Sequence, residues 1–151
     1  MFRPLRRIDK QMTSEDSIAL LKRGREGILG TIGDQGYPYT VVVNYVYFQG
    51  KIYFHCAREG HKIDNINKYD KVSFSVYDHV EVVGEQLNTH YQSVLVFGKA
   101  TVISPTAEIL MALIRKYVDM DIEKATEYIK REISETAVVE IEIEHMTGKK
   151  G

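Results

Sequence analysis

The sequence predicts a mainly β fold, an antiparallel sheet that closes into a small β-barrel with peripheral helices. Three observations lead to this prediction. About six segments are rich in β-branched and aromatic residues, and short hairpin connections join most of them. Helices are missing between most of these strands, which argues against a doubly wound parallel sheet. The chain has 151 residues, of which 44% are apolar, and this fits one domain spanning residues 1–151.

The N-terminal third is expected to hold one helix and two strands. Residues 13–24 begin with a hydroxyl cap, Thr13, and acidic residues follow in the first turn, which is typical of a helix start. A strand over residues 26–32 and a glycine-containing turn come next. Residues 40–48 are expected to form one strand that is apolar on both faces. Such a strand is either central in a barrel or pressed against a partner.

The rest of the chain alternates strands with short helices. Gln49-Gly50 predicts a tight hairpin turn, and Pro105 stands where a helix would begin. The expected elements are a strand over 51–57, a helix over 61–69, strands over 71–83 and 91–103 separated by a polar loop over 84–90, helices over 106–117 and 122–133, a final alternating strand over 136–145 and a polar tail over 147–151.

Residues 54–66 read as a strand, a loop and a helix, with Gly60, His61 and Lys62 where the helix begins. A helix N-terminus offers free backbone N–H groups and the positive end of the peptide dipole. Lys62 and a protonated His61 add positive charge, so this pattern predicts a cradle for a phosphate dianion. The alternative is a solvated helix end with a surface lysine. The strand–loop–helix context favours the phosphate cradle.

The composition narrows the classes of protein. A formal net charge of −1 gives no basic field for nucleic acid. One cysteine excludes an internal disulfide and suits a reducing compartment, so a cytoplasmic protein is expected. No apolar segment follows the basic residues near the N-terminus, so no signal peptide is expected, and no run is long enough to span a membrane.

Individual polar residues allow more than one interpretation. Asn44 lies among valines, and a buried amide there needs a partner, either a heteroaromatic ligand or, more commonly, backbone across the sheet. His55, Cys56 and His61 do not predict a metal site, because adjacent strand residues point to opposite faces. The polar residues 89–94 either complete a ligand site, in the same chain or from a second subunit, or form an ordinary loop-to-strand junction.

Most of the chain, from Arg6 through the last strand, resembles the nitroimidazole-resistance branch of the pyridoxamine 5′-phosphate oxidase-like flavoproteins. The stretch over residues 51–66 carries the most specific part of the likeness. The matching runs are Val42-Val43-Asn44-Tyr45-Val46-Tyr47, Gly50-Lys51-Ile52-Tyr53-Phe54-His55-Cys56-Ala57, Glu59-Gly60-His61-Lys62, Asp64-Asn65-Ile66, Tyr91-Gln92-Ser93-Val94 and Val96-Phe97-Gly98-Lys99-Ala100.

The resemblance implies a split β-barrel homodimer with two FMN molecules at the subunit interface. It implies that His55 and Cys56 flank the flavin ring, and that His61 and Lys62 match the cationic pair that holds the FMN phosphate. His61 is also a candidate for the substrate side of the flavin. The other implied cofactor-binding residues are Thr40, Val41, Val42, Val43, Asn44 and Tyr45 along the flavin edge, largely through their backbone, Asn65, and Tyr91, Ser93 and Val94 from the second subunit.

The function expected from this resemblance is that of an FMN-dependent oxidoreductase. Electrons would pass from a reduced nicotinamide or another donor to a small electron-poor acceptor such as a nitroaromatic, and no catalytic side chain is required because the flavin supplies the chemistry. Two alternatives stay open. The protein could hold a flavin or haem without turnover, with His55, His61 or His90 serving haem, or its site could be vestigial. Nothing marks a pyridoxamine phosphate substrate site.

Overall fold

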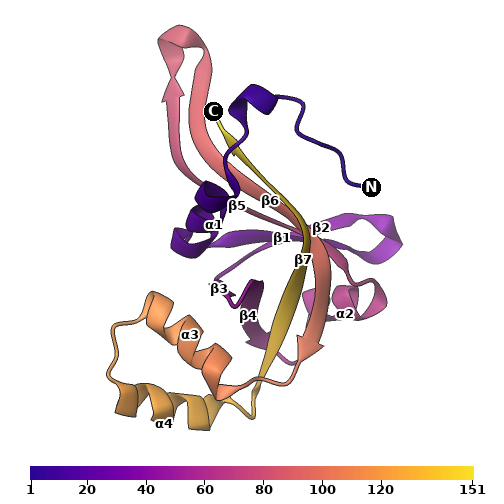
Figure 1. Ribbon diagram of the computed structural model, residues 1–151. Helices are drawn as coiled ribbons and strands as arrows, with labels where there is room; N and C mark the ends of the chain where they lie inside the picture. The colour runs from indigo at the N-terminus through magenta and orange to yellow at the C-terminus, as the bar shows by residue number, and fades with distance from the viewer.

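A computed structural model describes residues 1–151 and shows one seven-stranded antiparallel sheet in the order β2-β1-β5-β6-β7-β4-β3 (Figure 1). The strands are β1 (Gly27–Ile32), β2 (Pro38–Val43), β3 (Val46–Phe48), β4 (Lys51–Ala57), β5 (Lys71–Val83), β6 (Asn88–Ile103) and β7 (Thr136–Lys150). The helices are α1 (Ser14–Arg23), α2 (His61–Lys68), α3 (Ala107–Tyr117) and α4 (Ile122–Glu132), with short 3₁₀ turns at Ile8–Lys10, Asp34–Gly36 and Gly84–Gln86. The predicted mainly β, antiparallel fold with peripheral helices is confirmed.

The single strand predicted over residues 40–48 is wrong, because the chain breaks at Asn44 and Tyr45 into β2 and β3. The Tyr45 side chain is fully buried, and its hydroxyl donates to Leu21 O at 2.6 Å. Its backbone N–H donates to the hydroxyl of Tyr117 at 3.0 Å. These contacts use the Tyr45 backbone N–H and bury its side chain, so Tyr45 belongs to neither strand. As a result, two consecutive strands lie at opposite ends of the sheet order, which is the split in the barrel.

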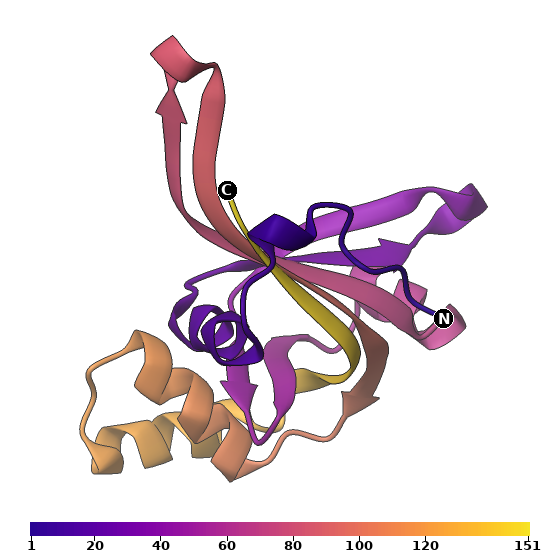
Figure 2. The same ribbon diagram turned by 45° about the horizontal axis from the view of Figure 1, so that its top comes forward.

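The polar tail predicted over residues 147–151 is also wrong, because β7 continues to Lys150 and pairs with β6. Gly148 lies opposite Val94 in this ladder. A Cβ at Gly148 would overlap the side chain of Ser17, so glycine permits the close approach of the strand to α1. Beyond this same end of the ladder, β5 and β6 extend as a two-stranded arm outside the barrel (Figures 1 and 2).

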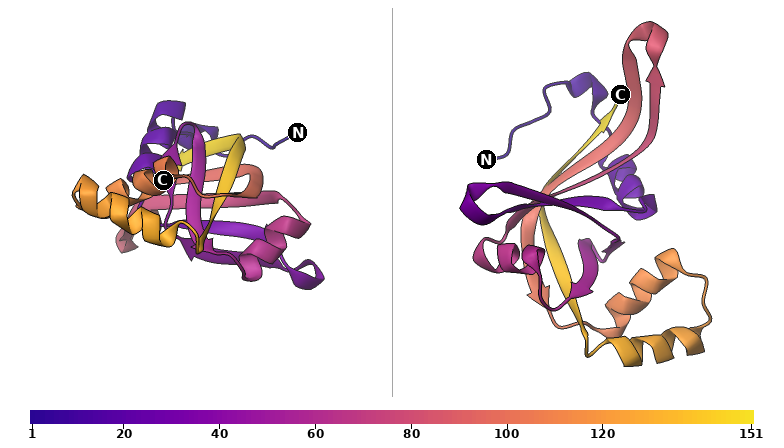
Figure 3. Two further views of the ribbon diagram at one scale, coloured as in Figure 1. Left: turned by 90° about the horizontal axis from the view of Figure 1, so that it is seen from below. Right: turned by 180° about the vertical axis from the view of Figure 1, so that it is seen from behind.

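Two apolar clusters hold the helices on the sheet. The larger cluster fills the barrel beneath α1 and α2 and includes Leu20, Phe54 and Phe74, all with no exposed surface. The smaller one joins Leu110 and Ile129, on α3 and α4, to the strands beneath them. The α3–α4 hairpin and α2 therefore cover different sides of the barrel (Figure 3). None of the helices combines the length and apolar character needed to cross a membrane.

Candidate functional site

The split leaves two strand edges without a neighbour. β2 pairs only with β1, over all six of its residues. β3 pairs only with the first part of β4, from Lys51 to Tyr53. From Phe54 to Ala57, β4 has β7 on one side and no strand on the other. Extending the β3–β4 register would place Asn44 beside His55, and both residues do line one cavity.

Register shows which backbone groups remain free on the edge of β2. The N–H of Gly33 donates to Tyr37 O at 2.7 Å, which closes the β1–β2 hairpin. Hydrogen-bonded and non-bonded pairs alternate along an antiparallel ladder. Tyr39, Val41 and Val43 therefore exchange hydrogen bonds with β1, and the N–H and C=O groups of Thr40 and Val42 point away from it. The side chains of Thr40 and Val42 are exposed.

The same reasoning applies to β4. The two-residue turn at Gln49-Gly50 makes Phe48 and Lys51 a bonded pair, so Tyr53 also bonds to β3. The backbone groups of Phe54 and Cys56 then bond to β7, and those of His55 and Ala57 lie on the free edge of β4. We call the two strand edges that carry the free backbone groups of Thr40, Val42, His55 and Ala57 the open seam.

The N-terminus of α2 lies close to this seam. Gly60 adopts a φ of 150°, in the region that favours glycine, and no side chain caps the helix. The first intrahelical bond runs from the N–H of Asp64 to Gly60 O. The N–H groups of His61, Lys62 and Ile63 therefore have no partner in the chain, and they present the positive end of the helix dipole.

The two cationic residues at this N-terminus have different surroundings. Lys62 lies near the Cys56 thiol, where its charge partly offsets the burial that raises the pKa of Cys56. His61 instead packs against Tyr39, with ring centroids 4.2 Å apart, and its Nε2 lies 3.9 Å from an Asp34 carboxylate oxygen. Asp34 would repel an anion held at His61. Lys62 and the free N–H groups are therefore the stronger part of the cradle.

Three of the residues expected to bind a cofactor have side chains that are closed off from it. Tyr45 is fully buried, Asn65 is 2% exposed and Val94 is 1% exposed. The Asn65 amide donates to the Thr31 hydroxyl at 3.0 Å, so it fastens α2 to β1. Val94 points into the barrel. These three side chains serve the core, so a cofactor would meet Tyr45, Asn65 or Val94 only through the backbone.

Asn44 bonds to the backbone across the sheet, which was the commoner of the two fates expected for it. Its Nδ2 donates to Arg25 O at 3.0 Å. The side chain is exposed and not buried, because it lies at the end of β2 beside a cavity. Its carbonyl oxygen has no partner in the chain and remains available to a ligand.

Tyr91 and Ser93 do not lie beside the seam of their own chain. Both are partly buried on β6, and β1 and β5 stand between β6 and β2 in the sheet. They occupy the outer face of the sheet, the same face as Thr40 and Val42. Residues that pair directly across neighbouring strands point to the same face, and two such rows cross the sheet: Val42–Ile28–Ser75–Leu95 and Thr40–Gly30–Ser73–Phe97. Tyr91 and Ser93 share this face because they lie four and two residues before Leu95 on β6. A ligand at the seam can meet Tyr91 or Ser93 only from another copy of the chain.

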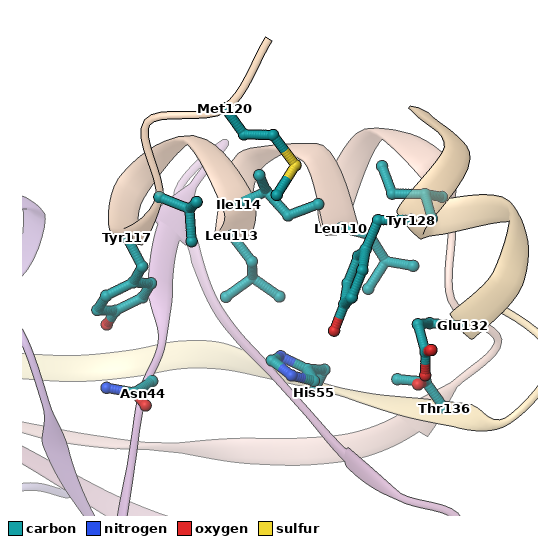
Figure 4. Close-up of a pocket in the computed structure, with 12 residues that line it drawn as sticks. Asn44, His55, Leu110, Leu113, Ile114, Tyr117, Met120, Tyr128, Glu132 and Thr136 are labelled. Carbon is teal, nitrogen blue, oxygen red and sulfur yellow. The ribbon is translucent and has the colours of Figure 1, made fainter. Parts of the chain in front are cut away.

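A cavity of about 320 Å³ between the α3–α4 hairpin and the sheet was not predicted from the sequence (Figure 4). It is lined by Asn44, His55, Leu110, Leu113, Ile114, Tyr117, Val118, Met120, Tyr128, Ile129, Glu132 and Thr136. Partial burial lowers the pKa of His55, which favours the neutral imidazole. The amphipathic pattern of the two helices is the only signal for this cavity, and it does not reveal which strand they cover.

Lys116 stands at the junction between α3 and the split. Its Nζ is buried without a hydrogen-bond partner and lies 3.7 Å from the centre of the Tyr45 ring. Burial, together with the charge of Arg25, lowers the pKa of Lys116 to about 8. The folded protein therefore carries an ammonium group in surroundings that disfavour its charge.

We expect Lys116→Met to stabilise the protein by about 1 kcal/mol at pH 7, a modest value because Lys116 is only half-buried. The wild-type folded pKa lies below the unfolded one, so wild-type stability should rise with pH from about 8 toward 10.5. The variant should lack this rise. Urea unfolding at pH 7 and pH 10 measures both effects. Arg115→Met, on the exposed face of α3, is the control. A less stable Lys116→Met protein would show that the contact with Tyr45 outweighs burial.

Comparisons with known proteins identify a family that matches this sequence and solved structures with a similar fold. A family model described as pyridoxamine 5′-phosphate oxidase matches residues 13–150. A search of curated proteins finds no match. Among solved structures, a conserved hypothetical protein from Mycobacterium tuberculosis has a TM-score of 0.84 at 17% identity, covering 97% of this chain and 90% of that one.

Two further solved structures have the same fold. A candidate 5-nitroimidazole antibiotic resistance protein from Bacteroides thetaiotaomicron has a TM-score of 0.76 at 19% identity, covering 93% of this chain and 86% of that one. A protein from Mycobacterium smegmatis described as binding FAD and haem has a TM-score of 0.74 at 18% identity, covering 94% of this chain and 73% of that one.

Proposed function

Since this chain belongs to the pyridoxamine 5′-phosphate oxidase family, we propose that it is a flavoprotein that holds FMN along the open seam. The phosphate would lie at the N-terminus of α2, and the ring edge along the free backbone groups of Thr40, Val42, His55 and Ala57. The observation that carries this proposal is the uncapped helix start, with Lys62 beside it, next to two unpaired strand edges.

The residues fit the chemistry of FMN. A phosphate dianion is satisfied by free N–H groups at a helix start and by an ammonium group. The polar edge of the flavin ring alternates carbonyl oxygens with an N–H group, and an unpaired strand edge offers the complementary alternation. When bound, FMN would supply hydride and electron transfer. The protein would bind and orient it and shield it from water.

We further propose that the protein is a homodimer, with a second copy covering the outer face of the sheet. This face is apolar for a surface: Val42 is 63% exposed, Tyr77 59%, and Leu95 and Phe97 37% each. Tyr91 of the partner subunit and Ser93 of the partner subunit would then contact the flavin ring on the side that this chain leaves uncovered. Size-exclusion chromatography with light scattering tests the mass.

The activity that we propose is reduction of a small electron-poor acceptor, with electrons from a reduced nicotinamide. The structural likeness to a candidate nitroimidazole-resistance protein supports this class of activity.

A second candidate function is haem binding without turnover. The Mycobacterium smegmatis protein with the same fold is described as binding FAD and haem, which supports a haem ligand. It is favoured by His55, whose ring nitrogens have no partner in the chain and whose lowered pKa keeps the imidazole in the neutral form that binds iron.

The absorbance spectrum of the purified protein tests these proposals. We expect the two-banded spectrum of a flavin, in the isolated protein or after titration with FMN, and no Soret band. Anaerobic addition of a reduced nicotinamide should then bleach the flavin, and nitrobenzene should restore its colour. A colourless protein that takes up no FMN contradicts flavin binding. A bound flavin that no nicotinamide reduces contradicts the proposed electron donor.

A further inference from the structure

We propose that the cavity beneath the α3–α4 hairpin is a binding pocket for an uncharged, planar aromatic ring. If the proposed function holds, this ring belongs to the electron acceptor. Hereafter we call this cavity the hairpin pocket.

The hairpin pocket has an apolar roof and a polar floor. Leu110, Leu113 and Ile114 of α3 form the roof, and His55 and Asn44 lie on the strand side below them (Figure 4). The hydroxyl of Tyr128 points from α4 toward His55. A flat ring fits this space with one face against the aliphatic side chains and its polar edge toward the floor. About 320 Å³ is room for one ring or two fused rings.

The charges of the lining disfavour an anion. The pocket contains no lysine or arginine, and its only carboxylate belongs to Glu132. Burial favours the neutral imidazole of His55. Arg25 and Lys116 contact the Tyr117 ring but do not line the cavity, so an anionic ligand would lose its hydration without gaining a cationic partner from the lining, and Glu132 would repel it. A phosphate ester or carboxylate is therefore a poor ligand, whereas a nitro or carbonyl oxygen can accept a hydrogen bond from neutral His55.

The position of His55 connects the hairpin pocket to the seam. Its backbone groups lie on the free edge of β4, and its side chain lines the pocket. Asn44, at the end of the opposing edge, lines the same pocket and has a free carbonyl oxygen. A ring in the hairpin pocket would thus lie next to any group that occupies the seam.

Isothermal titration calorimetry with a matched pair of probes tests the pocket. Nitrobenzene is uncharged, and 4-nitrobenzoate adds one carboxylate to the same ring. We expect nitrobenzene to bind the purified protein at least tenfold more tightly than 4-nitrobenzoate. Nitrobenzene should also shift the methyl NMR signals of Leu113 and Ile114. Equal affinities, or tighter binding of 4-nitrobenzoate, would overturn the proposal.

Two tryptophan substitutions, one in the α3–α4 loop and one at the first residue of α4, locate the binding. Met120 lines the pocket and Ile122 does not, and they are 36% and 64% exposed, so neither change threatens the core. Met120→Trp should reduce nitrobenzene affinity at least tenfold, and Ile122→Trp should leave it unchanged, with circular dichroism confirming that both fold. Unchanged binding to Met120→Trp would place the ring elsewhere and refute the pocket.

The same titrations separate this proposal from the flavin proposal. Nitrobenzene binding that Met120→Trp abolishes, in a protein that takes up no FMN, supports the pocket and contradicts the flavin assignment. FMN uptake without nitrobenzene binding contradicts the pocket and leaves the flavin assignment standing.

Discussion

Lys62→Ala should weaken FMN binding by about 1–3 kcal/mol, roughly 5- to 150-fold, because it removes a charge-assisted contact to the phosphate. Lys62 is partly buried near the Cys56 thiol, and no carboxylate pairs with it. Its ammonium group is therefore free to meet an anion at the start of α2. A fluorescence titration of the apoprotein with FMN measures the affinity.

Two controls make this result specific. Lys68→Ala removes the same charge from the far end of α2, where the side chain is 77% exposed and lies 3.8 Å from Asp34, so it should leave FMN affinity unchanged. Riboflavin has the same ring but no phosphate, so Lys62→Ala should not weaken its binding. An equal loss for FMN and riboflavin would mean that Lys62 supports the fold or the ring. Unchanged FMN affinity would remove Lys62 from the cradle.

The elements that the sequence predicted well are those fixed by neighbours in the chain. Thr13 accepts a hydrogen bond from the N–H of Asp16, as a helix cap should. Gln49 and Gly50 both have positive φ, as the predicted tight turn requires. The start of α2 was located to the residue, because a glycine followed by a polar turn is a local signal.

Contacts distant in sequence decided the rest. β2 and β3 separate because Tyr45 bonds to Tyr117, 72 residues away, and the last residues of the chain become strand because β6 lies beside them. The side chains of Asn65 and Val94 carry no local mark of which way they face, so the family likeness could not show that both serve the core. The hairpin pocket needs α3, α4 and β4 together, and no single segment predicts it.

Tyr117→Phe should lower the free energy of unfolding by about 1–3 kcal/mol, because it removes the group that satisfies the backbone at the split. The Tyr117 hydroxyl accepts from the N–H of Tyr45 at 3.0 Å and donates to Arg25 O at 2.6 Å. Phenylalanine keeps the ring in place but leaves the Tyr45 N–H unpaired. Arg25 O keeps its bond from Asn44, so the loss falls mainly on Tyr45.

Tyr128→Phe provides the matched control for this loss. Tyr128 lies on the same helical hairpin, it is 41% exposed, and its hydroxyl has no hydrogen-bond partner in the chain. Its replacement should change stability by less than about 0.5 kcal/mol. Urea unfolding at one fixed protein concentration measures both variants, since the stability of the proposed dimer would depend on concentration. If the two variants lose equal stability, the Tyr117 hydroxyl does not hold the split together, and the break between β2 and β3 must rest on the buried Tyr45 side chain and its hydrogen bond to Leu21 O.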